Sequence, residues 1–123
     1  MDNTKQANFI ATLLHGVTSA HILHLKQKGP GSFARHMALG ELYEELGGLV
    51  DQVAEDWQGL NGIIQTYPNN FKSPGQPLDY VSWLYNYVQT HRECMGKESH
   101  IQNNIDEVCS LLTRTMYKLA NLV

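Results

Sequence analysis

The sequence predicts an all-α fold, a four-helix bundle with a long crossover between the second and third helices. Three observations predict it. Apolar residues recur every three or four positions along four stretches, which is the period of one helix face. Proline and glycine separate these stretches, and no segment alternates apolar and polar residues as a half-buried strand would. With 123 residues, the chain has the size of one domain, 1–123.

The first helix is expected over about 4–28, where lysines, a glycine and a proline then end it. Its predicted stripe is Ile10, Leu14, Val17, His21 and His24. The second helix is expected over about 33–57. A glycine pair inside it either permits close approach of another helix or is simply tolerated there. Its predicted core stripe is His36, Leu39, Tyr43, Leu46, Val50, Val53 and Trp57.

Residues 58–76 are rich in glycine, proline and asparagine, so we expect a long connection with a short helical turn over 60–66. A long connection can cross the bundle and restart the next helix at the same end. The third helix should begin at Pro77 and run to about Cys94, with a stripe of Leu78, Val81, Leu84 or Tyr85, Val88 and His91. The fourth should run from Ser99 nearly to the end, with a stripe of Ile101, Ile105, Val108, Leu112, Met116, Leu119 and Val123.

Charge and composition exclude several classes of protein. The net charge of -3 argues against DNA binding, because phosphate contacts depend on an excess of lysine and arginine. No apolar run is long enough to span a membrane, and the first residues lack the pattern of a secretory signal. Cys94 and Cys109 do not form a CxxC unit, so we expect reduced thiols and a cytoplasmic location.

Six histidines against nine lysines and arginines are the unusual feature of the composition. His24 ends the stripe of the first helix and His36 begins that of the second. Asp51 and Glu55 lie one turn apart on the second helix, roughly 22 Å further along its axis than His36. One chain therefore cannot easily close all four around one ion. Either the pairs are unrelated, or an antiparallel two-fold dimer brings His36 of one copy beside Asp51 and Glu55 of the other, twice.

Two imidazoles and two carboxylates suit iron(II), zinc or manganese(II), and open coordination positions would admit an oxidant. His21, one turn before His24 on the same face, is a further candidate ligand. The alternative is that these are ordinary core and surface residues and that no metal binds.

The segment 24–36 reads HLKQKGPGSFARH and resembles the first turn of Dps-type miniferritins, in which histidine, glycine, phenylalanine and histidine follow in this order. Segments 41–45 and 51–55 resemble the rest of that family's second helix, and 105–108 and 116–120 its last helix. The family's ligand spacing, His-x11-His-x14-Asp-x3-Glu, is reproduced by His24, His36, Asp51 and Glu55.

The resemblance implies a ferritin-like fold and an iron-binding ferroxidase centre at a dimer interface. His24 and His36 would come from one subunit, Asp51 and Glu55 from its two-fold mate, and these four would be both the metal ligands and the catalytic residues. In the family, bound iron(II) is oxidised by hydrogen peroxide and stored in a twelve-subunit shell, so a homodimer and a dodecamer are the implied assemblies.

Several residues depart from the family pattern. Leu25 replaces its tryptophan, Gly40 replaces an acid that helps to hold a second iron, and the basic N-terminal tail of DNA-binding relatives is missing. These departures favour binding of one metal ion over fast two-iron chemistry. Shortened chains of this kind also resemble phage proteins. The alternative function is therefore a non-enzymatic ferritin-like binding protein without iron chemistry, such as a phage-encoded inhibitor or a small-ligand sequestering protein in the host cytoplasm.

Overall fold

The computed structural model describes residues 2–69 and 74–123, and in these it contains helices and no strand. The elements are α1 (Thr4–Leu25), α2 (Ser32–Asn61), α3 (Pro77–His91), the short 3-10 helix η1 (Arg92–Met95) and α4 (Ser99–Asn121). The predicted all-α class and the four helices are confirmed.

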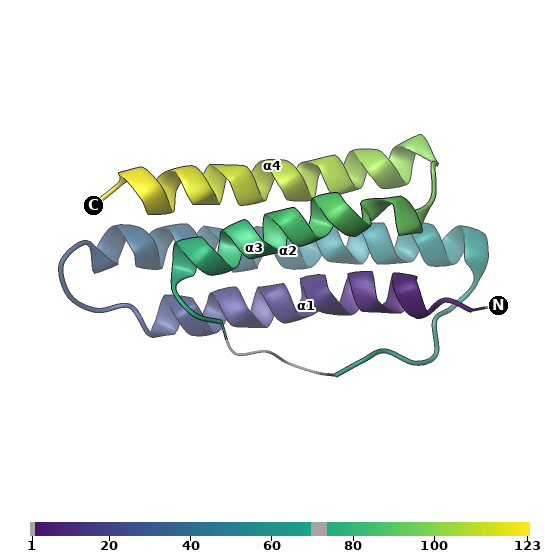
Figure 1. Cartoon of the computed structure of the whole chain (residues 1–123), viewed down its shortest axis with the longest axis horizontal. Coiled ribbons are helices and arrows are strands. Elements are labelled where there is room, and N and C mark those ends of the chain that lie inside the picture. The colour runs from purple at the N-terminus through teal and green to yellow at the C-terminus, as the bar shows by residue number, and fades with distance from the viewer. Residues whose placement is uncertain (1, 70–73) are drawn as a thin grey trace.

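The four helices lie side by side along the long axis of the molecule (Figure 1). α1 and α4 run in one direction, and α2 and α3 run in the other. α2 packs against both α1 and α4, and α3 packs mainly against α4. The seam between α1 and α3 is the sparsest of the helix contacts around the bundle. Among the described residues, none of the helices is both long and apolar enough to cross a membrane.

α2 ends later than the sequence predicts, and the helical turn expected over 60–66 is wrong. The helix continues to Asn61 and stops at Gly62, whose φ of +96° favours glycine. Residues 62–69 have no regular secondary structure. Ile64 is nevertheless buried, and its backbone N–H donates to Oε1 of Gln58 over 2.9 Å. The start of this connection is therefore tied to the last turns of α2.

The core is formed by the inner faces of all four α-helices. The α2 stripe is confirmed for Leu39, Leu46, Val50, Val53 and Trp57, whereas His36 and Tyr43 are half-buried at its edge. Val81, Leu84 and Val88 are buried on α3, and Ile101, Ile105, Val108 and Leu112 are buried on α4. Three residues expected on the inner faces of α3 and α4 are wrong: Leu78 and His91 lie at the surface, and Val123 is fully exposed because α4 ends at Asn121.

The predicted stripe of α1 is also wrong in part. Ile10 is buried, but Leu14 is 42% exposed and His21 is exposed. The buried face contains Ala7, Phe9, Leu13, Gly16, Ser19, Ala20 and Leu23. Its small residues let neighbours approach closely, since a Cβ at Gly16 would lie 2.9 Å from Cδ2 of Leu84. A prediction based on the spacing of large apolar residues therefore misses this face of α1.

The turn from α3 to α4 is organised by Arg92, with which η1 begins. Its guanidinium donates to Oε1 of Gln102 over 2.9 Å, to the backbone carbonyl of Gln102 over 3.1 Å and to Asp106 over 2.6 Å. The amide of Gln102 returns hydrogen bonds to the carbonyls of Arg92 and Gly96. The third α-helix therefore ends at His91, earlier than the sequence predicts, and η1 leads into this braced turn.

Candidate functional site

The turn between α1 and α2 brings His24 and His36 together. Gly29 and Gly31 have φ values of +87° and +76°, which lets the chain reverse within a few residues. Nε of Arg35 donates to Oε1 of Gln27 over 2.6 Å and braces the two helix ends. The two histidines, twelve positions apart in the sequence, thus become neighbours across the turn.

The two imidazoles form a reciprocal pair. Nδ1 of His24 lies 2.7 Å from the carbonyl oxygen of His36, and Nδ1 of His36 lies 2.8 Å from that of His24. The rings stack with centroids 3.6 Å apart and an angle of 18° between their planes. A carbonyl oxygen only accepts, so both Nδ1 atoms carry the hydrogen, and in the neutral rings Nε2 keeps a free lone pair.

His21 and Tyr43 extend this pair into what we call the histidine cluster: His21, His24, His36 and Tyr43. The ring of His21 stacks on that of Tyr43, with centroids 4.0 Å apart and an angle of 7° between the ring planes. His24 meets Tyr43 edge-on at 5.3 Å. His21 is exposed and the other three are half-buried. The cluster is therefore open to solvent at the His21 side.

Gly40 makes room for this cluster on α2. The ring of His24 packs directly over it, in the space that the side chain of a larger residue would take. Gly40 is therefore part of the packing of His24.

Asp51 and Glu55 are not brought to the histidine cluster. Both are exposed on α2, and neither makes an ion pair or hydrogen bond within the described part of the chain. In residues 2–69 and 74–123 no three His, Cys, Asp or Glu side chains are grouped so that they could hold a metal ion. Within one chain, the geometry provides a pair of imidazoles without carboxylate ligands.

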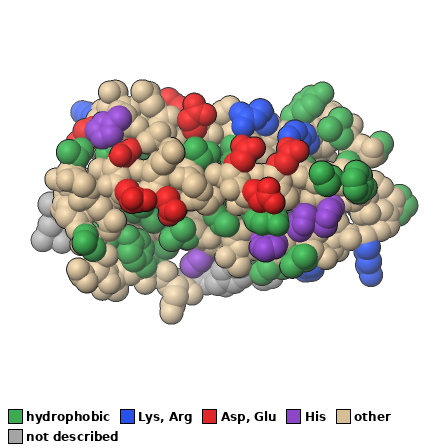
Figure 2. Space-filling view, turned by 180° about the vertical axis from the view of Figure 1, so that it is seen from behind, with side chains coloured by type: hydrophobic (Ala, Val, Ile, Leu, Met, Phe, Trp, Pro, Cys, Tyr) green, Lys and Arg blue, Asp and Glu red, His purple; other side chains and the backbone are tan. Residues whose placement is uncertain are grey.

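The outer face of α2 is acidic. Its exposed carboxylates are Glu41, Glu44, Glu45, Asp51 and Glu55. Glu41 pairs with Lys118, and Glu45 lies 3.7 Å from Arg114, both on α4. Figure 2, seen from behind, shows acidic side chains across the middle of this side of the molecule, with histidine side chains to the right, along the lower edge and at the upper left.

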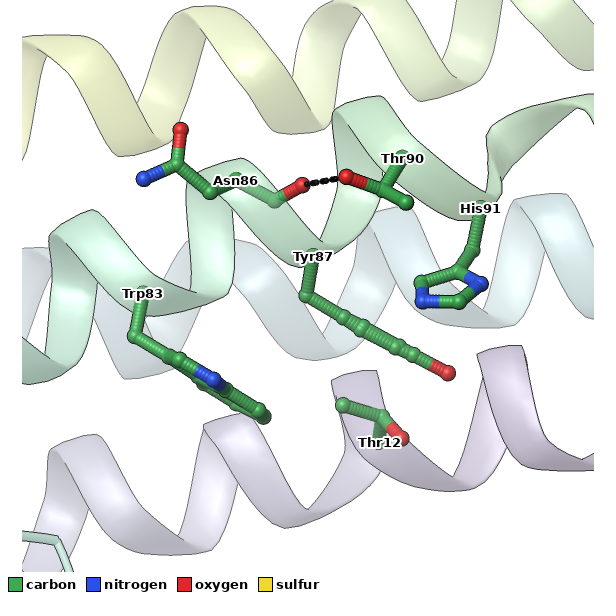
Figure 3. A pocket seen from close by; sticks show the side chains of 6 residues that line it. All are labelled: Thr12, Trp83, Asn86, Tyr87, Thr90 and His91. Carbon is green, nitrogen blue, oxygen red and sulfur yellow. Dashed lines mark hydrogen bonds between the residues drawn. The ribbon is translucent and has the colours of Figure 1, made fainter.

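The structure adds a groove between α1 and α3, which the sequence interpretation did not predict. It has a volume of about 400 Å³ and is lined by Thr12, Trp83, Asn86, Tyr87, Thr90 and His91 (Figure 3). Trp83 is 50% exposed. The centroids of the Trp83 and Tyr87 rings lie 5.6 Å apart, with an angle of 76° between the ring planes. The centroids of the Tyr87 and His91 rings lie 4.3 Å apart. The spacing of Tyr80, Trp83, Tyr87 and His91 along one side of α3 is the sequence signal that could have indicated it.

Among the groups with a shifted pKa are two cysteine thiols and Tyr80. Burial raises the pKa of the Cys94 and Cys109 thiols, which are both free. Burial also raises the pKa of Tyr80, and the hydroxyl of Ser19 opposes this in part. All three groups therefore favour their neutral, protonated forms at neutral pH.

Comparison with known proteins gives one family match. Residues 24–119 match a family model described as a family of unknown function, DUF5856. The matched region begins at His24 and includes His36, Asp51, Glu55 and the aromatic residues of α3. Neither the curated proteins nor the solved structures give a match. Because the family model matches most of its length, the chain belongs to the DUF5856 family.

Proposed function

We propose that this chain is a ferritin-like, metal-binding protein that binds iron(II) through Nε2 of His24 and His36, with ligands shared across a homodimer. One observation carries the proposal: each imidazole is fixed by an Nδ1–H to carbonyl bond, at 2.7 and 2.8 Å. Histidines that ligate metals almost always use their second ring nitrogen in this way, which fixes the tautomer and raises the basicity of the ligating nitrogen.

The directions of the helices support the ferritin-like part of the proposal. α2 and α3 run the same way, so the connection between them must join opposite ends of the bundle (Figure 1). A four-helix bundle with one long crossover connection is the ferritin-like arrangement.

A second copy of the chain would supply the carboxylates. Asp51 and Glu55 are exposed and have no partner among the described residues. Gly47 and Gly48 lie on the same helix, and a Cβ at either would meet nothing within 4 Å, so another helix can approach there. If two α2 helices pack antiparallel, His36 of one copy lies beside Asp51 and Glu55 of the other, and symmetry produces two such sites.

The charge of α2 makes this association dependent on cations. In the antiparallel arrangement the two-fold axis passes near residues 44 and 45, so Glu44 and Glu45 of both copies approach one another. Like charges across an interface oppose association. A divalent ion at each site offsets part of that repulsion, so we expect metal binding and dimer formation to be linked.

Gly40 supplies no ligand for a second ion, and the site therefore favours one metal per histidine pair. Iron(II) is the expected cargo. Zinc and manganese(II) suit the same nitrogen and oxygen ligands and are the natural comparison ions. Oxidation of the bound iron by peroxide, and assembly into a larger shell, are extensions of the proposal that depend on the resemblance to miniferritins.

The first test is anaerobic titration with iron(II), followed by solution mass. The wild type should bind one ion per chain and shift from monomer to dimer. His36→Ala and Asp51→Ala should each lose binding, while His100→Ala, an exposed histidine on α4, should bind normally. Equal uptake by the wild type and both site variants would falsify the proposal. No uptake by the wild type would overturn it too, and would favour a binding protein without iron chemistry.

Mixing the two defective variants tests the shared site directly. A mixed dimer of His36→Ala and Asp51→Ala holds one intact set of ligands, with histidines from the second variant and carboxylates from the first. Binding should return to roughly half of a site per chain in these mixed dimers. A site formed within one chain would show no recovery on mixing.

A further inference from the structure

The groove between α1 and α3 has the geometry of a shallow stacking site. Trp83, Tyr87 and His91 reach from α3 toward α1, and Thr12 lies beneath Tyr87 (Figure 3). The rings of Trp83 and Tyr87 meet nearly at right angles, at 76°. One flat molecule can therefore stack on the exposed face of Trp83 while its edge meets Tyr87.

Two polar groups at the groove have no internal partner. The hydroxyl of Thr12 and the side-chain amide of Asn86 make no hydrogen bond within the described part of the chain. The backbone carbonyl of Asn86 is occupied, because Thr90 donates to it over 2.9 Å. A donor and an acceptor thus remain available beside the aromatic surface.

Among the described residues that line the groove there is no carboxylate, lysine or arginine. A strongly charged ligand would lose water without gaining an opposite charge, so the lining favours a neutral molecule. The volume of about 400 Å³ lies near the lower end of the range for small-molecule sites.

We propose that this groove binds a small, uncharged, planar heteroaromatic molecule of nucleobase size, which stacks on Trp83 and hydrogen-bonds at the groove edge. This site is separate from the histidine cluster, and the proposal does not depend on metal binding. Because the groove is open to solvent, we expect a dissociation constant on the order of 1 mM for a simple ligand.

The test uses adenosine as the probe and the whole chain as the target. The chain has two tryptophans, of which Trp57 is buried in the core and Trp83 is half exposed. In a nitrogen–proton correlation spectrum, the indole N–H signal of Trp83 should shift with adenosine until it saturates, while that of Trp57 stays in place. Ribose alone should shift neither signal.

Equilibrium dialysis of labelled adenosine then measures the contribution of stacking. Trp83→Leu should weaken binding by about tenfold or more, and Trp83→Phe, which keeps an aromatic face, should recover most of the affinity. Tyr117→Leu is the matched control, an exposed aromatic residue on α4 outside the groove. Equal binding by wild type and Trp83→Leu, or no saturable shift of the Trp83 signal, would overturn the proposal.

Discussion

His24 occupies the space into which a side chain at residue 40 would project. A Cβ built on Gly40 would lie 3.1 Å from Cε1 and 3.2 Å from Nδ1 of His24, which is closer than most Cβ contacts. The imidazole cannot simply move away, because it is hydrogen-bonded to the carbonyl of His36 and stacked on that ring. Glycine at this position therefore leaves the space in which the histidine pair packs.

Gly40→Ala should destabilise the protein by about 1 kcal/mol in urea unfolding without metal. Alanine gains about 1 kcal/mol in helix propensity, but crowding in a packed site costs about 1–3 kcal/mol. Gly48→Ala is the control, because its Cβ would meet nothing within 4 Å. It should stabilise the protein by about 0.5–1 kcal/mol. Equal stabilisation by both substitutions would show that His24 is free to move.

Leu13 and Leu14 test which face of α1 is buried. Leu13 is 1% exposed and Leu14 is 42% exposed. Leu13→Ala should cost about 2–5 kcal/mol of the free energy of unfolding because it removes packed core atoms. Leu14→Ala should cost less than about 1 kcal/mol. Chemical denaturation measures the free energy of unfolding of the two variants. A larger loss for Leu14→Ala than for Leu13→Ala would support the stripe that the sequence predicts.

Arg92, which pairs with Asp106, should contribute more to the free energy of unfolding than Arg114, which pairs with Glu45. Its side chain is 20% exposed and joins Gln102 and Asp106 across the α3–α4 turn. Arg92→Ala should cost about 1–3 kcal/mol, since it leaves half-buried acceptors without a donor. Arg114→Ala should cost less than about 0.5 kcal/mol, because its pair with Glu45 is more than half exposed on both sides. Thermal and urea unfolding should agree on this order.

Stability should fall as the pH rises above about 9. Burial raises the pKa of Tyr80, Cys94 and Cys109 in the folded chain, so the unfolded chain loses these protons first. Unfolding is then favoured by deprotonation, and the stabilisation present at neutral pH is lost. Tyr80→Phe and Cys94→Ala should each flatten the decline between pH 7 and pH 10, measured with reduced thiols. An unchanged slope in both variants would contradict this assignment.

The number and type of helices followed from the sequence because local signals were strong. Proline at 77 and glycines at 29, 31 and 96 mark the ends of apolar stripes, and such breaks depend little on the rest of the fold. The inner face of α4 was predicted correctly through Leu112 for the same reason. The α1 face was not, because Gly16 and Ser19 are buried by the closeness of their neighbours and carry no apolar side chain of their own.

The candidate site was predictable as a set of residues and not as a geometry. The spacing of His24 and His36 around a glycine-rich turn indicated that the two residues approach each other. Their reciprocal hydrogen bonds to backbone carbonyls depend on side-chain rotamers that are fixed only in the folded state. The role of Gly40 in admitting the ring of His24 depends on the distance between α1 and α2, which no local pattern specifies. The aromatic groove likewise depends on the sparse packing of α1 against α3.

The bonds between His24 and His36 also have a consequence for the order of folding. They close a short loop between adjacent helices, which costs little chain entropy and can form early. The contacts of α3 with α1 join distant parts of the sequence. They can form only after the connection between α2 and α3 has crossed the bundle. We therefore expect the α1–α2 hairpin to be a kinetic unit, with the α1–α3 seam the last to close and the first to open.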